Sequence, residues 1–115
     1  MEKQETIAFG IVLVMIVMDY LTGLMKAIHA HDVSSEKMRE GLWHKGGFVL
    51  VMVLAEIIEH AQLALDIGYA VPIIVPAATW IIITETSSII ENIGALSPEL
   101  ANSPIMKLFR SSKQQ

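Results

Sequence analysis

The sequence has no cysteine and few charged side chains. Without cysteine, disulfides and thiolate metal sites are excluded. Charged residues make up 17% of the 115 residues, against about 25% in a typical soluble domain. Hydrophobic residues make up 53%, and residues 7–18 carry no charge at all. This composition is typical of a membrane protein and argues against a soluble enzyme.

The sequence also lacks the signals of nucleic-acid binding and of catalysis. The net charge is −4, and no basic run is interleaved with aromatic residues, so no nucleic-acid partner is expected. There is no Ser/His/Asp arrangement and no glycine-rich phosphate loop, so we expect neither an enzyme nor a cofactor. His29 and His31 have a spacing that metal ligands can use, but no third ligand accompanies them, so no metal site is predicted.

Three long apolar segments are present, and they predict an all-α integral membrane protein with about three transmembrane helices. The spans are expected at about residues 7–28, 46–65 and 70–93, within a single domain of residues 1–115. At 1.5 Å per residue the first span reaches roughly 33 Å, enough to cross the hydrocarbon core of a bilayer. The first residues, MEKQE, are not a positively charged leader, so we expect this segment to be retained.

Several small or turn-forming residues predict where these helices begin and end. Ser34–Ser35 predict the cap of a short helix within a polar connector of residues 29–45. Gly46–Gly47 predict the start of the second span, or a hinge. Pro76 is expected to kink the third helix, and Gly94 to cap its C-terminus.

The tail, residues 97–115, has two Ser-Pro pairs, each a signature of helix initiation. The second pair precedes a mixture of apolar and basic residues, which predicts a short amphipathic helix resting on an anionic membrane surface. The basic residues expected to anchor it are Lys107, Arg110 and Lys113.

The distribution of Lys and Arg predicts the orientation in the membrane. Three spans place the N-terminus and the second loop on one side, where the basic residue is Lys3. The other seven of the 8 basic residues fall at the end of the first span, in the first loop and in the tail. Because cytoplasmic loops are enriched in Lys and Arg, we expect the N-terminus outside and the C-terminus inside.

Polar residues inside the first span share one helix face. Asp19, Thr22, Gly23 and Lys26 have the spacing i, i+3, i+4, i+7. Gly23 and Ala27 form a small-xxx-small pair, which lets two helices approach closely.

The other two spans carry similar polar stripes: Glu56 with Glu59 and His60, and Glu85 with Ser88 and Asn92. Charged side chains are costly in lipid, so these stripes point to an interior surface. They either satisfy one another within one three-helix unit or, in an oligomer, line contacts between copies or a water-filled lumen. Glu56 could be a proton-binding carboxylate, or an acid that is hydrogen-bonded or paired with Lys26.

Three blocks of residues, in order along the chain, carry a resemblance to a known family. They are residues 19–27, DYLTGLMKA; Ser34–Ser35 followed by residues 41–45, GLWHK; and residues 85–92, ETSSIIEN. With these blocks the sequence resembles the small phage-lysis and toxin-secretion holins of Gram-positive bacteria and their phages. It departs from the family pattern near Glu56 and Glu59, where an Asp is expected after the second apolar run.

The resemblance implies a holin that oligomerises in the cytoplasmic membrane of the host cell. It would open lesions that release an endolysin or a toxin and cause lysis. The partners would be further copies of the chain, the lipid bilayer and the released protein. Two other functions stay open: a proton- or ion-coupled carrier using Glu56, and a membrane anchor that recruits a partner.

Candidate site residues fall into two groups besides the basic tail. Those expected in helix packing and oligomerisation are Asp19, Thr22, Gly23, Ala27, Glu56, Glu85, Ser88, Glu91 and Asn92. Those of the loop motif are Ser34, Ser35, Gly41 and Lys45.

Overall fold

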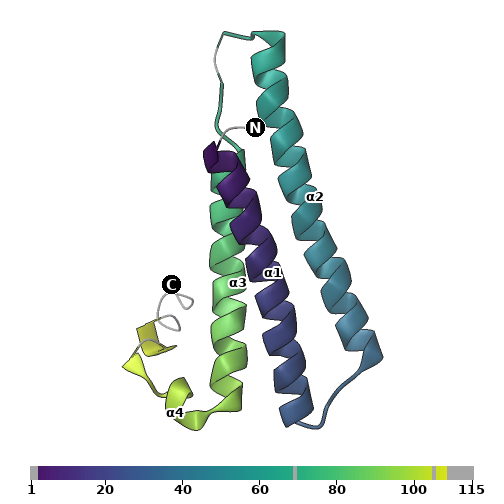
Figure 1. Ribbon diagram of the computed structural model, residues 1–115, viewed down its shortest axis with the longest axis vertical. Helices are drawn as coiled ribbons and strands as arrows, with labels where there is room; N and C mark the ends of the chain where they lie inside the picture. The colour runs from purple at the N-terminus through teal and green to yellow at the C-terminus, as the bar shows by residue number, and fades with distance from the viewer. Residues whose placement is uncertain (1–2, 69, 105, 109–115) are drawn as a thin grey trace.

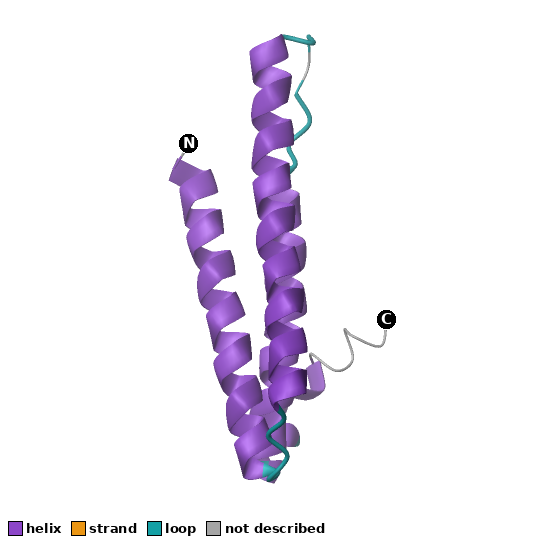
Figure 2. Cartoon of the chain, turned by 90° about the vertical axis from the view of Figure 1, so that its right-hand side faces the viewer, coloured by secondary structure: helices purple, strands orange, loops and turns teal. Residues whose placement is uncertain are grey.

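The computed structural model describes residues 3–68, 70–104 and 106–108, which contain helices and no strand (Figures 1 and 2). The helices are α1 (Lys3–His29), α2 (Ser35–Leu65), α3 (Ile74–Leu96) and the short α4 (Pro98–Ala101). At 1.5 Å per residue the first three reach about 40, 46 and 35 Å, more than a bilayer core requires. All three are long and apolar enough to cross a membrane. The predicted all-α class with three membrane-spanning helices is confirmed.

Helix α2 is much longer than predicted. It begins at Ser35, and the Ser34 hydroxyl accepts a hydrogen bond from the Lys37 N–H at 3.3 Å. The capping role of the serine pair is therefore confirmed. The connector is shorter than the predicted residues 29–45, because α1 ends at His29 and α2 already begins at Ser35. The hinge at Gly46–Gly47 is wrong, because α2 runs unbroken through both glycines. Good helix formers such as Glu, Lys, Met and Arg fill its first turns, and an interior glycine lowers helix stability without ending the helix.

The start of α3 also differs from the prediction. The helix begins at Ile74, so Pro76 lies in its first turn. The N–H that proline lacks would have no intrahelical acceptor there, and the expected kink does not arise. The exposed donors are satisfied from α2 instead: the Glu59 carboxylate accepts hydrogen bonds from the N–H groups of Ile73 and Ile74, the latter at 3.1 Å.

The end of α3 lies beyond Gly94, so the predicted C-cap there is wrong. Gly94 makes room for the tail: a Cβ on it would lie 2.8 Å from Cε of Met106. The Ser97-Pro98 prediction is confirmed, since α4 starts at Pro98.

After Ser103 the chain is helical again at residues 104 and 106–108. The Ser103 hydroxyl accepts a hydrogen bond from the Met106 N–H at 3.3 Å. Met106 is buried against α3, while Lys107 and Leu108 are exposed. Arg110 and Lys113 lie outside the described residues. The described part of the tail thus packs on α3 through Met106.

The three long helices pack unequally. Helix α1 lies between α2 and α3 in Figure 1; it packs along α3 extensively and against α2 sparingly. The small core joins Val12 of α1 with residues of the other two helices, namely Phe48, Met52, Ala55, Ile74, Ala78 and Ile81.

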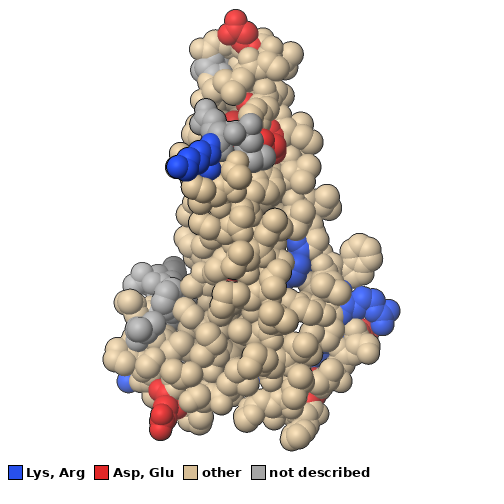
Figure 3. All heavy atoms as spheres, viewed as in Figure 1, with Lys and Arg blue, Asp and Glu red and all other residues tan. Residues whose placement is uncertain are grey.

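The outer surface is apolar on all three helices. Val14, Leu50 and Ile83 are each more than half exposed, and most of the face seen in Figure 3 carries no charge. A water-soluble monomer rarely exposes so much continuous apolar surface, whereas lipid is a good solvent for it. The fold is that of a multi-pass membrane protein.

Candidate functional site

A buried lysine ties the three long helices together. Lys45, on α2, donates to both carboxylate oxygens of Glu85 on α3, at 2.9 and 2.7 Å. It also forms an ion pair with Asp19 on α1. The side chains of Lys45, Asp19 and Glu85 are 12%, 9% and 1% exposed.

An amide and a hydroxyl complete this group. The Asn92 side-chain N–H₂ donates to Asp19 Oδ1 at 3.1 Å and to the Thr22 hydroxyl at 3.0 Å. Thr22 in turn donates to the Met18 carbonyl at 2.8 Å. We call Asp19, Thr22, Lys45, Glu85 and Asn92 the Lys45 cluster.

Helix periodicity explains why these residues meet. Asp19 and Thr22 are three residues apart, so they share one face of α1, and Glu85 and Asn92, seven apart, share one face of α3. These faces lie in the extensive α1–α3 contact, and Lys45 reaches the same point from α2. One cation faces two carboxylates, so the charged groups sum to −1 if all are ionised. Three charged groups can lie together inside the bundle because each is paired and hydrogen-bonded.

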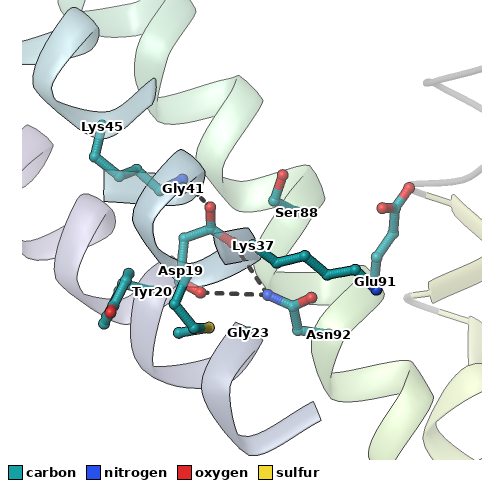
Figure 4. Close-up of a pocket in the computed structure, with 10 residues that line it drawn as sticks. Asp19, Tyr20, Gly23, Lys37, Gly41, Lys45, Ser88, Glu91 and Asn92 are labelled. Carbon is teal, nitrogen blue, oxygen red and sulfur yellow. Dashed lines mark hydrogen bonds and ion pairs between the residues drawn. The ribbon is translucent and has the colours of Figure 1, made fainter. Parts of the chain in front are cut away.

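Beside the Lys45 cluster lies an open cavity of about 250 Å³, shown in Figure 4. Asp19, Lys45 and Asn92 point toward one another at its wall, with Ser88 and Glu91 alongside on α3. Gly23 completes the wall on α1, and a Cβ there would lie 3.6 Å from the Asn92 amide nitrogen. A methyl group would fit at this distance, whereas a larger side chain at position 23 would press on Asn92 of α3.

A neighbouring cavity of about 300 Å³ extends toward the first loop. Ala27 lines it together with Gly23 and Lys26. The alternative pairing of Glu56 with Lys26 is wrong, because Lys26 lies near the opposite end of α1 from that acid.

Glu56 belongs to a second polar group. His60 Nε2 lies 2.9 Å from Glu56 Oε1, one turn away on α2, and 3.3 Å from Glu5 Oε2 in the first turn of α1. We call Glu5, Glu56 and His60 the His60 cluster. Glu5 lies 14 residues before Asp19 on α1, about 21 Å away along the helix. The apolar core lies between the two clusters.

The structure thus brings four of the nine predicted packing residues into the Lys45 cluster, and Gly23, Ser88 and Glu91 lie beside it. Those in contact or lining the same cavity are Asp19, Thr22, Gly23, Glu85, Ser88, Glu91 and Asn92. Glu56 lies apart from them, and Ala27 lines the neighbouring cavity. Gly41 lines the first cavity from α2.

Sequence reasoning missed the roles of Lys45, Glu59 and Glu5. Lys45 was assigned to a loop motif, although the helix-forming run after Ser34 would have placed it three turns into a helix. The roles of Glu59 and Glu5 depend on contacts with residues far away in the sequence, and no local signal could have shown them.

The profile of the bacteriophage holin family matches residues 3–109. No curated protein and no solved structure matches the chain significantly. The matched range covers all three spanning helices and both polar clusters. This family is not a family of enzymes. The chain belongs to the bacteriophage holin family, as the three sequence blocks had indicated.

Proposed function

We propose that copies of this chain associate laterally in the cytoplasmic membrane of the host bacterium and open lesions there. Through these lesions an endolysin, or a toxin in a toxin-secreting system, would leave the cell. Membership in the holin family and the multi-pass architecture support this function.

The Lys45 cluster is the observation that carries the proposal. A helix bundle that needed only to reside in lipid would have no use for three ionisable side chains buried at one point. The cavity beside them, about 250 Å³, holds on the order of eight water molecules at their liquid volume. A passage for a folded protein must therefore be built from several copies.

The sparse packing of α2 suggests how polar groups could reach such a passage. Of the five residues of the Lys45 cluster, α2 contributes only the lysine, while the acids and Asn92 remain on the tightly packed α1–α3 pair. Movement of α2 would separate Lys45 from Asp19 and Glu85 and leave their charges to be solvated. In an oligomer, water in a shared lumen can supply that solvation, whereas lipid cannot.

The carrier alternative fits the geometry less well. A transported proton or ion is expected to bind near the middle of the membrane. Glu56 instead lies level with Glu5, in the first turn of α1, and is paired with His60. An anchor for a partner would not require the Lys45 cluster at all.

The proposal is tested by expressing the chain in a bacterium together with a separately supplied endolysin that has no export signal. Turbidity should fall abruptly only when both proteins are present. A culture that keeps growing with both proteins present, and with the chain detected in its membrane, would contradict lysis as the function.

The Gly23→Leu variant tests the packing role in the same assay. A leucine at this position meets Asn92 and forces α1 away from α3, so lysis should be delayed or abolished while insertion into the membrane is retained. Gly10→Leu is the matched control, because a Cβ at Gly10 has no neighbour within 4 Å, and it should lyse cells on the normal schedule. Normal timing with Gly23→Leu would show that close packing at Gly23 is not needed.

A further inference from the structure

The His60 cluster gathers three potential metal ligands from two helices. One atom from each of Glu5, Glu56 and His60 can be chosen so that all three lie within 4.8 Å of one another. The imidazole nitrogen lies at the centre of the group, 2.9 Å from Glu56 Oε1 and 3.3 Å from Glu5 Oε2. Glu5 has only 10% of its side chain exposed, so this carboxylate is held inside the bundle.

The carboxylates of this cluster lack a sufficient counter-charge. Glu59 lies next to Glu5 and adds a third acid. In the part of the chain that the structure describes, no Lys or Arg forms an ion pair with any of the three. One oxygen of Glu56, Oε2, is buried and has no hydrogen-bond partner among these residues. A buried carboxylate oxygen without a donor is costly, and a cation bound to the other oxygen of the same carboxylate would offset its charge.

The distances between the ligand atoms suit a tetrahedral ion. Zinc binds imidazole nitrogen and carboxylate oxygen at about 2.0–2.2 Å, which places neighbouring ligands of a tetrahedron about 3.3–3.6 Å apart. The distance from His60 Nε2 to Glu5 Oε2, 3.3 Å, lies in this range, and the distance to Glu56 Oε1, 2.9 Å, is slightly shorter. Calcium and magnesium prefer six or more oxygen ligands, and a site centred on imidazole favours a transition metal instead.

We propose that Glu5, Glu56 and His60 form a binding site for a divalent transition-metal ion, with zinc as the ion that fits best. His60 has 43% of its side chain exposed, so water can reach the cluster and fill the fourth coordination position. The acidic side chains seen in Figure 3 toward the end where the chain begins would attract cations to the site.

The ion would fasten the first turn of α1 to α2. The two helices pack sparingly against each other, and the Lys45 cluster holds them only at the other end of the core. A second fixed point between α1 and α2 would restrict the movement of α2.

Binding is tested on the full chain, purified in detergent micelles without a histidine tag. Cobalt serves as the spectroscopic probe, because its visible absorption reports tetrahedral coordination, and zinc should displace it at one ion per chain. Glu5→Gln, Glu56→Gln and His60→Gln should each weaken zinc binding by about tenfold or more, since loss even of a group that only supports a ligand costs 10–100-fold.

The double variant His29→Gln/His31→Gln is the matched control and should bind zinc as the unchanged chain does. It removes the histidine pair of the first loop and leaves the cluster intact. Zinc binding that survives His60→Gln, or that is lost in this control, would overturn the site. So would the absence of binding by the unchanged chain at neutral pH.

A distance measurement keeps the proposal testable if a variant folds poorly. The chain has no native cysteine, so spin labels can be placed at Gln4→Cys on α1 and Leu63→Cys on α2, both exposed positions. Zinc should narrow the distribution of distances between the labels, and it should have no effect when His60→Gln is added. An unchanged distribution on zinc binding would refute the fastening of α1 to α2. None of these measurements depends on lysis.

Discussion

Lys45 is the residue on which the three spanning helices converge. It is the cation shared by Asp19 and Glu85, which come from different helices and are almost fully buried. Its alkyl stem also brings the ammonium to 5.8 Å from the centre of the Phe48 ring, within reach of a weak cation–π attraction. Removing the lysine would leave two carboxylates facing each other without compensation.

Lys45→Met should therefore destabilise the bundle by about 3–5 kcal/mol, as is usual when one partner of a buried ion pair is removed. The measurement is unfolding in mixed micelles with increasing sodium dodecyl sulfate, followed by circular dichroism. Lys37→Met is the control: Lys37 pairs with Asp32 at 3.0 Å, but both side chains are about two-thirds exposed, and such pairs contribute at most about 1 kcal/mol.

A triple variant separates charge from shape in the same experiment. Asp19→Asn, Lys45→Met and Glu85→Gln together leave no unpaired charge, so much of the lost stability should return. If Lys45→Met unfolds at the same detergent concentration as the unchanged chain, the ion pairs do not hold the helices together.

Four of the five residues of the Lys45 cluster could be predicted from the sequence. Asp19, Thr22, Glu85 and Asn92 stand out because they are polar residues at helical spacing that interrupt apolar runs. Lys45 does not stand out in this way, since it precedes an apolar run and the sequence pattern places it in a loop motif. Its role follows only once α2 is known to begin ten residues earlier.

At the scale of the helices, α2 differs most from expectation. Two adjacent glycines favour a break, yet α2 passes through Gly46–Gly47 with helical backbone on both sides. The capping hydrogen bond at Ser34 and the helix-forming residues after it start the helix early. The long α2 then delivers Lys45 at one level and His60 at another, about 22 Å away along the same helix.

Replacing both glycines by alanine should test whether α2 needs flexibility there. A Cβ at either position has no neighbour within 4 Å, so Gly46→Ala/Gly47→Ala should be accommodated. It should stabilise the chain by up to about 1 kcal/mol per site through helix propensity. Stability is measured in mixed micelles and lysis timing in cells, and the timing should be unchanged. A stable variant that no longer lyses cells would mean that α2 bends at this pair during lesion formation.

The helix ends show which local sequence signals are enough to predict where a helix begins or ends. The helix starts predicted at Ser34 and Ser97 are confirmed, because a cap or a Ser-Pro pair acts on the residues next to it. The predicted cap at Gly94 is wrong, since the small size of this residue makes room for Met106, twelve residues further along. The start of α3 depends on Glu59, fourteen residues before Ile73, and such a partner cannot be identified from the local sequence.

For the molecule as a whole, the two ends of the bundle differ in their number of Lys and Arg residues. The end of α1, the start of α2 and the end of α3 lie together at one end in Figure 1. The basic residues near that end, among those described, are Lys26, Lys37, Arg39 and Lys107. The opposite end holds Lys3 with Glu5, Glu59 and Asp66. The positive-inside tendency therefore favours an orientation with the N-terminus outside, and the basic tail would rest on the inner leaflet.

This orientation can be tested with single cysteines, because the chain has none of its own. Gln4→Cys and Leu65→Cys lie at the end expected outside, and Glu36→Cys lies at the end expected in the cytoplasm; all three positions are exposed. A maleimide that cannot cross membranes, applied to intact cells before lysis begins, should label the first two and spare the third. Permeabilised cells are the control, in which all three should react equally. Labelling of Glu36→Cys alone in intact cells would show that the chain has the opposite orientation. It would also place the His60 cluster on the cytoplasmic side, where zinc would have to come from the host cell instead of the surroundings.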